Sequence, residues 1–255
     1  MLAADARGQP RRGDPWLGLA VAAWIALGLW LDAGASLNTG ASLNAQRAIG
    51  VATWAILVAA LARERPLQRA QVLVALALAT AGEYALSPGL GLYIYRLHDV
   101  PSFVPPGHGL VYLAALNLGR SVLARRAGRT VLQATIVALA AWSLWGVTGA
   151  PRQDLLGFVL FIAFAGFVWR GGSPRVYVAC ALLCTWLELL GTSLGNWAWA
   201  TSAGPFTIGN PPSGIPGAYC VIDVVALSVG TALARRWVRR GTVLFDAGES
   251  LGRKP

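Results

Sequence analysis

Eight apolar runs, each about as long as a membrane-spanning helix, divide this sequence. Of the 255 residues, 56% are hydrophobic and only 13% are charged, whereas about 25% of the residues in a soluble domain are charged. The fold class is therefore all-α, as a polytopic membrane protein with short loops. The predicted spans are residues 16–32, 48–62, 68–87, 107–123, 130–147, 154–169, 176–193 and 215–234.

The positions of the arginines predict how the chain is oriented. A net charge of +10 could suit a nucleic-acid partner, but the positive charges lie between apolar runs and in the tails. If the amino end is cytoplasmic and the spans alternate, 18 of the 21 Lys and Arg residues face the cytoplasm, and the three exceptions are Arg47, Arg96 and Arg152. This asymmetry predicts a bacterial-type plasma (inner) membrane protein with both termini cytoplasmic, and no nucleic-acid partner.

One pattern appears twice in the chain. A glutamate ends an apolar run, Gly-x-aromatic-x-aromatic follows, and a Pro-Pro pair opens the next run. The two copies comprise Glu83, Gly91, Tyr93, Tyr95 and Pro105-Pro106, and Glu188, Gly195, Trp197, Trp199 and Pro211-Pro212.

The matched spacing of these copies predicts an internal duplication. Residues 16–125 would form a first four-helix repeat and residues 126–236 a second. Because each half has an even number of spans, the repeats would be parallel rather than inverted. Residues 1–15 are expected to form a disordered basic tail, and residues 237–255 a basic cytoplasmic tail.

Three acids, Glu83, Glu188 and Asp223, lie within apolar runs. An acid in a span is costly to insert and suggests a functional site with a partner. Aligning the Pro-Pro pairs places Asp223 opposite Asn117. Two interpretations stay open: Glu83–Asn117 and Glu188–Asp223 are hydrogen-bonded pairs that join helices, or the acids are catalytic.

The aromatic pairs Tyr93/Tyr95 and Trp197/Trp199 alternate at a spacing of two, which indicates an extended segment rather than a helix face. They could form an interfacial aromatic belt. Alternatively, they could line a cavity in which the π faces of the rings stabilise cations. His108, whose counterpart in the second copy is Gly214, could be a helix cap or a ligand. The candidate substrate-binding residues are Tyr93, Tyr95, His108, Asn117, Asn196, Trp197 and Trp199.

Neither a metal site nor a cofactor is expected. The chain has two histidines, and its cysteines, Cys180, Cys184 and Cys220, lie in or beside apolar runs without a matching Cys or His pair nearby. The one lysine, Lys254, is in the tail, which excludes a retinal Schiff base within the membrane.

The duplicated pattern resembles the integral membrane proteins of carotenoid biosynthesis, namely the carotenoid hydratases and, more distantly, the membrane lycopene cyclases. The resemblance covers roughly residues 70–120 and 175–230. It implies that acids on the spans protonate a polyene, and by position these acids are Glu83, Glu188 and Asp223. The sequence departs from the family at its Pro-Pro-Gly-His-Gly stretch, and its second copy has tryptophans where tyrosines are usual.

Three functions compete at this point. The first is acid-catalysed hydration or cyclisation of an apolar isoprenoid or carotenoid-like lipid. The second is a pigment- or lipid-binding accessory subunit without chemistry, which would associate with other membrane proteins. The third is a proton-coupled transporter that uses the same acids as a relay.

Overall fold

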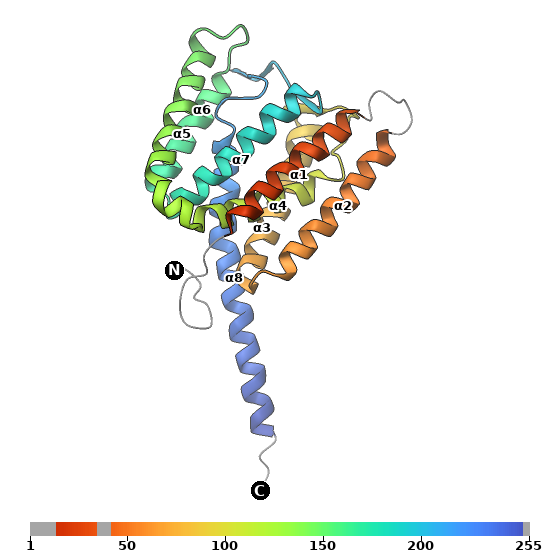
Figure 1. Ribbon diagram of the computed structural model, residues 1–255, viewed down its shortest axis with the longest axis vertical. Coiled ribbons are helices and arrows are strands. Elements are labelled where there is room, and N and C mark those ends of the chain that lie inside the picture. Colours follow the sequence, from red (N-terminus) through yellow and green to blue (C-terminus); the bar gives the residue numbers. More distant parts are fainter. Residues whose placement is uncertain (1–13, 35–41, 252–255) are drawn as a thin grey trace.

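The computed structural model describes residues 14–34 and 42–251, and the predicted N-terminal tail lies almost entirely outside these residues. Eight α-helices lie within the described ranges (Figure 1). They are α1 (Pro15–Gly34), α2 (Ser42–Ala62), α3 (Pro66–Tyr84), α4 (Val104–Arg120), α5 (Val122–Thr148), α6 (Leu155–Arg170), α7 (Pro174–Ser193) and α8 (Pro216–Leu251).

Six of these helices are long and apolar enough to cross a membrane. They are α1, α2, α3 with the turn that follows it, α5, α7 and α8. The apolar helix α6 and the central helix α4 are shorter, with 16 and 17 residues. The chain is therefore a multi-pass helical membrane protein.

Some predicted boundaries are wrong. Helix α5 begins at Val122 rather than at residue 130, so Arg125, Arg126 and Arg129 lie on a helix instead of in a turn. The reason is a cap: the Ser121 hydroxyl accepts the backbone N–H of Ala124 at 3.1 Å, and arginine is a good helix former. Helix α8 also continues to Leu251, well beyond the predicted end at residue 234.

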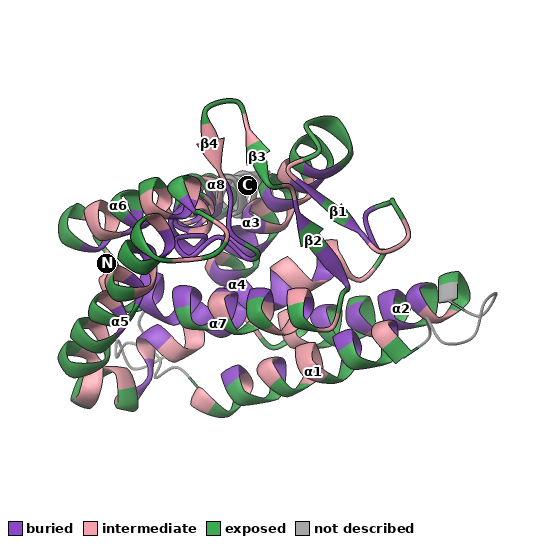
Figure 2. Cartoon of the chain, turned by 90° about the horizontal axis from the view of Figure 1, so that it is seen from above, coloured by how far each residue is buried: buried purple, intermediate pink, exposed green. Residues whose placement is uncertain are grey.

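Helix α4 is the centre of the bundle. Its residues from Gly109 to Leu116 are all buried, and Figure 2 shows it enclosed by its neighbours. A Cβ atom at Gly119 would lie 2.9 Å from the backbone of Val176 on α7. Likewise, a Cβ atom at Gly230 of α8 would lie 2.6 Å from the Cα atom of Gln71 on α3. Glycine thus lets both helix pairs pack with their backbones in close contact.

Short strands cover one end of the bundle, which we call the loop end. Strand β1 (Tyr93–Tyr95) pairs with β2 (Trp197–Trp199), and β3 (Ser202–Ala203) pairs with β4 (Phe206–Thr207), both antiparallel. Figure 2 looks onto this end of the bundle and shows all four strands on the side that faces the viewer. The opposite end carries Arg63, Arg65, Arg69, Arg120 and Arg125, and we call it the arginine-rich end.

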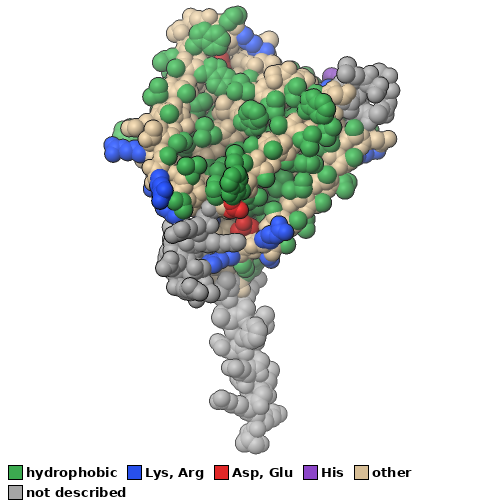
Figure 3. All heavy atoms as spheres, in the orientation of Figure 1, with side chains coloured by type: hydrophobic (Ala, Val, Ile, Leu, Met, Phe, Trp, Pro, Cys, Tyr) green, Lys and Arg blue, Asp and Glu red, His purple; other side chains and the backbone are tan. Residues whose placement is uncertain are grey.

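Hydrophobic side chains are spread over the whole face of the bundle shown in Figure 3. Large apolar residues are widely exposed, including Trp169 at 88% and Trp16 at 74%. A soluble monomer rarely exposes so much contiguous apolar surface, which agrees with a lipid environment.

Candidate functional site

The two copies of the sequence pattern form the loops between α3 and α4 and between α7 and α8, which we call the first and second motif loops. The first motif loop begins with a change of helix type. Pro88 has no backbone N–H, and residues Ala85–Gly89 form a π-helical turn, η2, at the end of α3. Gly91 then adopts a φ of +64°, and in the second copy Gly195 adopts a φ of +73°. Since L-residues rarely adopt this conformation, a glycine suits both positions. After each glycine the chain turns back across the bundle as a strand.

The two motif loops pair with each other in β1 and β2. Tyr93 lies opposite Trp199 and Tyr95 opposite Trp197, with ring centroids 4.7 Å and 5.9 Å apart. These four side chains are buried, whereas Ile94, between the tyrosines, is exposed. The prediction of extended segments is confirmed, and the burial of the rings does not fit an interfacial belt.

Beneath the strands lies a cavity of about 290 Å³. Its walls are mostly apolar and come from α1, α2, α3, α4, α7 and α8. Its polar groups include Glu83, Glu188, His108 and Tyr219, and the rings of both strands line it as well.

The outer wall of this cavity reaches the lipid-facing surface. Leu78 on α3, Leu86 on η2 and Val221 on α8 line the cavity and are also exposed. The cavity wall at α3, η2 and α8 is therefore apolar on its outer side as well.

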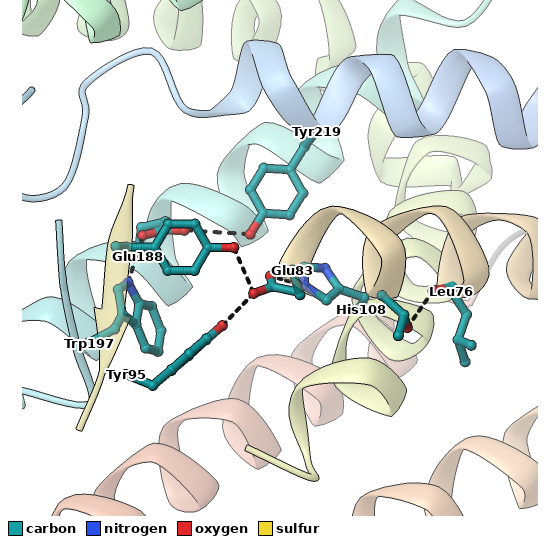
Figure 4. A network of polar contacts seen from close by, with 9 residues as sticks. Leu76, Glu83, Tyr95, His108, Glu188, Trp197 and Tyr219 are labelled. Atoms are coloured by element: carbon teal, nitrogen blue, oxygen red, sulfur yellow. Dashed lines mark hydrogen bonds and ion pairs between the residues drawn. The ribbon is translucent and has the colours of Figure 1, made fainter. Parts of the chain in front are cut away.

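Glu83 is held by three neighbours (Figure 4). Its Oε2 atom accepts the hydroxyls of Tyr93 and Tyr95, each at 2.7 Å. Its Oε1 atom lies 2.7 Å from Nε2 of His108 on α4. Three such contacts stabilise an ionised carboxylate. His108 is thus a contact of a buried acid rather than a helix cap.

Glu188 has a different set of neighbours. Its Oε2 atom accepts the indole N–H of Trp197 at 3.0 Å and that of Trp199 at 3.1 Å. Its Oε1 atom has only the hydroxyl of Tyr219, at 3.5 Å, which is long for an O–H···O hydrogen bond. One oxygen of Glu188 is therefore well satisfied and the other is nearly free.

The two tyrosines on β1 act as hydrogen-bond donors. Burial, together with the nearby carboxylate of Glu83, raises the pKa of Tyr93 and that of Tyr95 well above the ordinary value. Both phenols therefore stay protonated at physiological pH, and each donates a hydrogen bond to Glu83.

Three residues predicted for the site do not line the cavity. Asn117 lies nine residues beyond His108 on α4, or about 13 Å along the helix axis, and contacts the carbonyl of Leu113 rather than Glu83. Asp223 is buried next to Cys180, not Glu188. The Glu83–Asn117 and Glu188–Asp223 pairs are therefore absent from the described hydrogen bonds.

The third of these residues, Asn196, belongs to a clamp at the loop end. Its Nδ2 atom donates to Oδ2 of Asp32 at 2.7 Å and to the carbonyl of Leu29 at 3.1 Å. Arg96 donates to the other oxygen of Asp32 at 2.8 Å. The clamp joins the end of α1 to both motif loops.

Sequence reasoning missed this clamp and also Tyr219. One signal was available for the clamp: Arg96 is among the few arginines expected at the loop end, and Asp32 ends a predicted span at the same end. A buried partner for such an arginine could have been sought there.

Replacing Asp32 with alanine is expected to lower the free energy of unfolding by about 2–3 kcal/mol, because the buried Asn196 and the half-buried Arg96 would each lose a hydrogen-bond acceptor. Thermal denaturation in detergent, followed by size-exclusion chromatography, measures the effect. Asp99→Ala is the matched control, because Asp99 is an exposed acid in the same loop. Equal stability of the two variants would contradict a structural role for the clamp.

The fold and the site define a multi-pass helical membrane protein with two buried glutamates and four aromatic side chains around one apolar cavity. Comparison with protein-family models, curated proteins and solved structures finds no match to any of them.

Proposed function

We propose that this protein is an inner-membrane enzyme that modifies an apolar isoprenoid or carotenoid-like lipid by acid catalysis, through hydration or cyclisation. The observation that carries the proposal is the unequal hydrogen bonding of two glutamates in one apolar, aromatic cavity. Glu83 has three contacts that favour the ionised form, whereas one oxygen of Glu188 is nearly free. One glutamate is thus suited to accept a proton and the other to donate one.

Glu188 is the proton donor in this proposal. The two indole N–H groups on its Oε2 atom can only donate, so the carboxylic proton resides on Oε1. That oxygen has one long contact, with Tyr219. The proton is therefore available to a carbon–carbon double bond in the cavity.

Addition of this proton leaves a carbocation on the neighbouring carbon. The π faces of the Tyr93, Tyr95, Trp197 and Trp199 rings stabilise positive charge. In hydration, water forms a C–O bond with the cation and releases a proton to the Glu83–His108 pair. In cyclisation, a second double bond forms the C–C bond, and a neighbouring carbon then loses a proton to the same pair.

We further infer that the two halves of the chain are related by a duplication, with an equivalence different from the one that the Pro-Pro pairs suggest. The backbone of Gln71 contacts Gly230, and that of Val176 contacts Gly119. Gln71 lies as far before Glu83 in the sequence as Val176 lies before Glu188. His108 and Tyr219 lie equally far before Gly119 and Gly230.

This equivalence makes His108 and Tyr219 counterparts, and each contacts the glutamate of its own half. The antiparallel pairing of β1 with β2 is also what a twofold axis along the membrane normal would produce. Tyr112, rather than Asn117, then corresponds to Asp223. A structure-based superposition of residues 16–125 on 126–236 that fails to overlay Glu83 on Glu188 would contradict the duplication.

The proposed topology has eight spans, with α4 crossing as a short helix inside the bundle and α6 as a short helix at its edge. A reporter inserted at Ser202 is expected on the outer side, and one fused after residue 240 in the cytoplasm, because the arginine-rich end should be inside. Reporter activity in whole cells and spheroplasts measures both. If the two reporters lie on the same side, the number of spans is wrong.

Filling the cavity is expected to expel the lipid. Ala218→Phe places a ring in the cavity from α8, whereas Ala59→Phe adds the same ring on the exposed face of α2 and is the matched control. Mass spectrometry of lipids that co-purify with each variant should show an isoprenoid or polyene species with wild type and Ala59→Phe, reduced at least tenfold with Ala218→Phe. Equal lipid content in both variants would contradict binding in this cavity, and retained lipid without turnover would favour the accessory-subunit alternative.

A further inference from the structure

Asp223 is a buried acid that the proposed chemistry does not use. It lies on α8, is 1% exposed, and its Oδ2 atom has no hydrogen-bond partner within the described part of the chain. The titratable groups near it are Tyr112 on α4, Tyr177, Cys180 and Cys184 on α7, and Cys220 on α8. A buried polar atom without a hydrogen-bond partner lowers the stability of the fold, so the presence of Asp223 here calls for an explanation.

A small second cavity separates Asp223 from the candidate active site. Its volume is about 10 Å³, which is close to the space that one water molecule needs. Asp223, Tyr112, His108 and Tyr219 all line it. An internal water needs two to four polar partners, and this cavity offers them. The hydroxyl of Tyr112 also lacks a partner among the described residues.

The second cavity adjoins both glutamates through different side chains. His108 borders it and contacts Glu83. Tyr219 borders it and contacts Glu188. Imidazole has two ring nitrogens and a phenol both donates and accepts, so each can pass a proton between an internal water and its glutamate. Figure 4 shows His108 and Tyr219 pointing toward their glutamates.

Buried polar groups continue from this cavity toward the arginine-rich end. Ala75 of α3 lines the cavity, and Gln71 and Gln68 follow within the next two turns of the same helix. Both glutamines are buried, and the side-chain oxygen of each lacks a partner within the described ranges. Gln71 donates to the hydroxyl of Thr231 on α8 at 3.0 Å. Buried polar side chains thus continue from the second cavity toward the arginine-rich end, where α3 and α8 pack closely.

We propose that Asp223 is a proton-relay residue, which connects both glutamates to bulk solvent at the arginine-rich end through an internal water in the second cavity. The inference rests on the proposed function for its purpose. Each turnover removes a proton from Glu188 and adds one to Glu83–His108. The internal water lets that proton return through His108 and Tyr219, and Asp223 keeps both acids in exchange with the solvent.

The test follows proton exchange at Glu188 without any substrate. Purified full-length protein in nanodiscs is transferred from H₂O to D₂O, and the infrared C=O band of protonated Glu188 is recorded over time. The band is assigned by its loss in Glu188→Gln. Asp223→Asn is expected to slow the isotopic shift of this band at least tenfold, and Tyr112→Phe several-fold. Tyr112→Phe also provides the answer if Asp223→Asn does not fold.

Ser143→Ala is the matched control. Ser143 on α5 is likewise buried, and its hydroxyl also lacks a partner among the described residues, but it does not line the second cavity. In Ser143→Ala, the C=O band of Glu188 should shift in D₂O at the wild-type rate. Wild-type exchange rates in both Asp223→Asn and Tyr112→Phe would overturn the relay but leave the proposed function intact. If no band is lost in Glu188→Gln, Glu188 is not a protonated acid, and both the proposed function and the relay are wrong.

Discussion

Glu188→Gln is expected to lower turnover by about 10²–10⁴-fold, the range that a general acid contributes, while the folded protein remains abundant. Two indole N–H groups require an oxygen at the Oε2 position. The amide oxygen of glutamine can take that position, which leaves an NH₂ group toward Tyr219 and the cavity. This amide preserves the hydrogen bonds to the strands but has no acidic proton for a double bond.

The measurement combines turnover of apolar lipid extracted from the native membrane with thermal denaturation of each purified variant. Glu188→Leu is the companion variant, because it leaves both indole N–H groups without an acceptor. Each unsatisfied donor should lower the free energy of unfolding by about 1–3 kcal/mol. Glu188→Leu should accumulate poorly, whereas Glu188→Gln should not. Full activity of a well-folded Glu188→Gln variant would show that Glu188 is structural.

Glu83→Gln is expected to lower turnover by about 10²-fold or more, because the pair with His108 would no longer accept the proton released after the cation forms. The amide can still accept the hydroxyls of Tyr93 and Tyr95, and its NH₂ group can face His108 in the tautomer that accepts at Nε2. The fold should therefore persist.

Tyr95→Phe is the graded control for this variant. It keeps the ring on β1 and removes one of the three contacts of Glu83, so activity should fall less than tenfold. Steady-state rates of both variants with the same lipid extract give the comparison. If Tyr95→Phe is as inactive as Glu83→Gln, the loss comes from the geometry of the strands and not from the proton acceptor.

Much of the fold follows from local properties of the sequence. Long apolar runs predict helices because the lipid determines their length, and the described helices include six that can span. The alternation of Tyr93 with Tyr95 and of Trp197 with Trp199 predicts strands, which β1 and β2 confirm. The structure also places both predicted glutamates, Glu83 and Glu188, at one cavity.

The position of Asp223 could not be predicted in the same way. Aligning the Pro-Pro pairs assumes that both fourth helices begin at the same point, but Pro105 lies inside α4, whereas Pro212 lies before α8. The cause is a contact distant in sequence: Asp154 accepts the backbone N–H groups of Gly209 and Ser213 at 2.8 Å and 2.7 Å and holds this segment as a loop.

Contacts between distant segments explain the other omissions. The clamp at Asp32 joins residues more than sixty positions apart, and Tyr219 reaches Glu188 from another helix. Apart from the expected position of Arg96 and Asp32 at the same end of the bundle, no local pattern marks such pairs, because they depend on how the helices pack. The same holds for Asn196, whose neighbours Trp197 and Trp199 face the cavity while its own side chain binds α1.

Deuterium transfer to carbon tests the central claim most directly. Purified protein in nanodiscs is incubated in D₂O with apolar lipids from the native membrane, and the recovered lipids are examined by mass spectrometry. Acid catalysis by Glu188 predicts a polyene or isoprenoid that gains solvent deuterium at carbon with the wild-type protein and not with Glu188→Gln. If no lipid gains deuterium with the wild-type protein, or if Glu188→Gln labels the same lipid at the same rate, the cavity is not an acid-catalytic site.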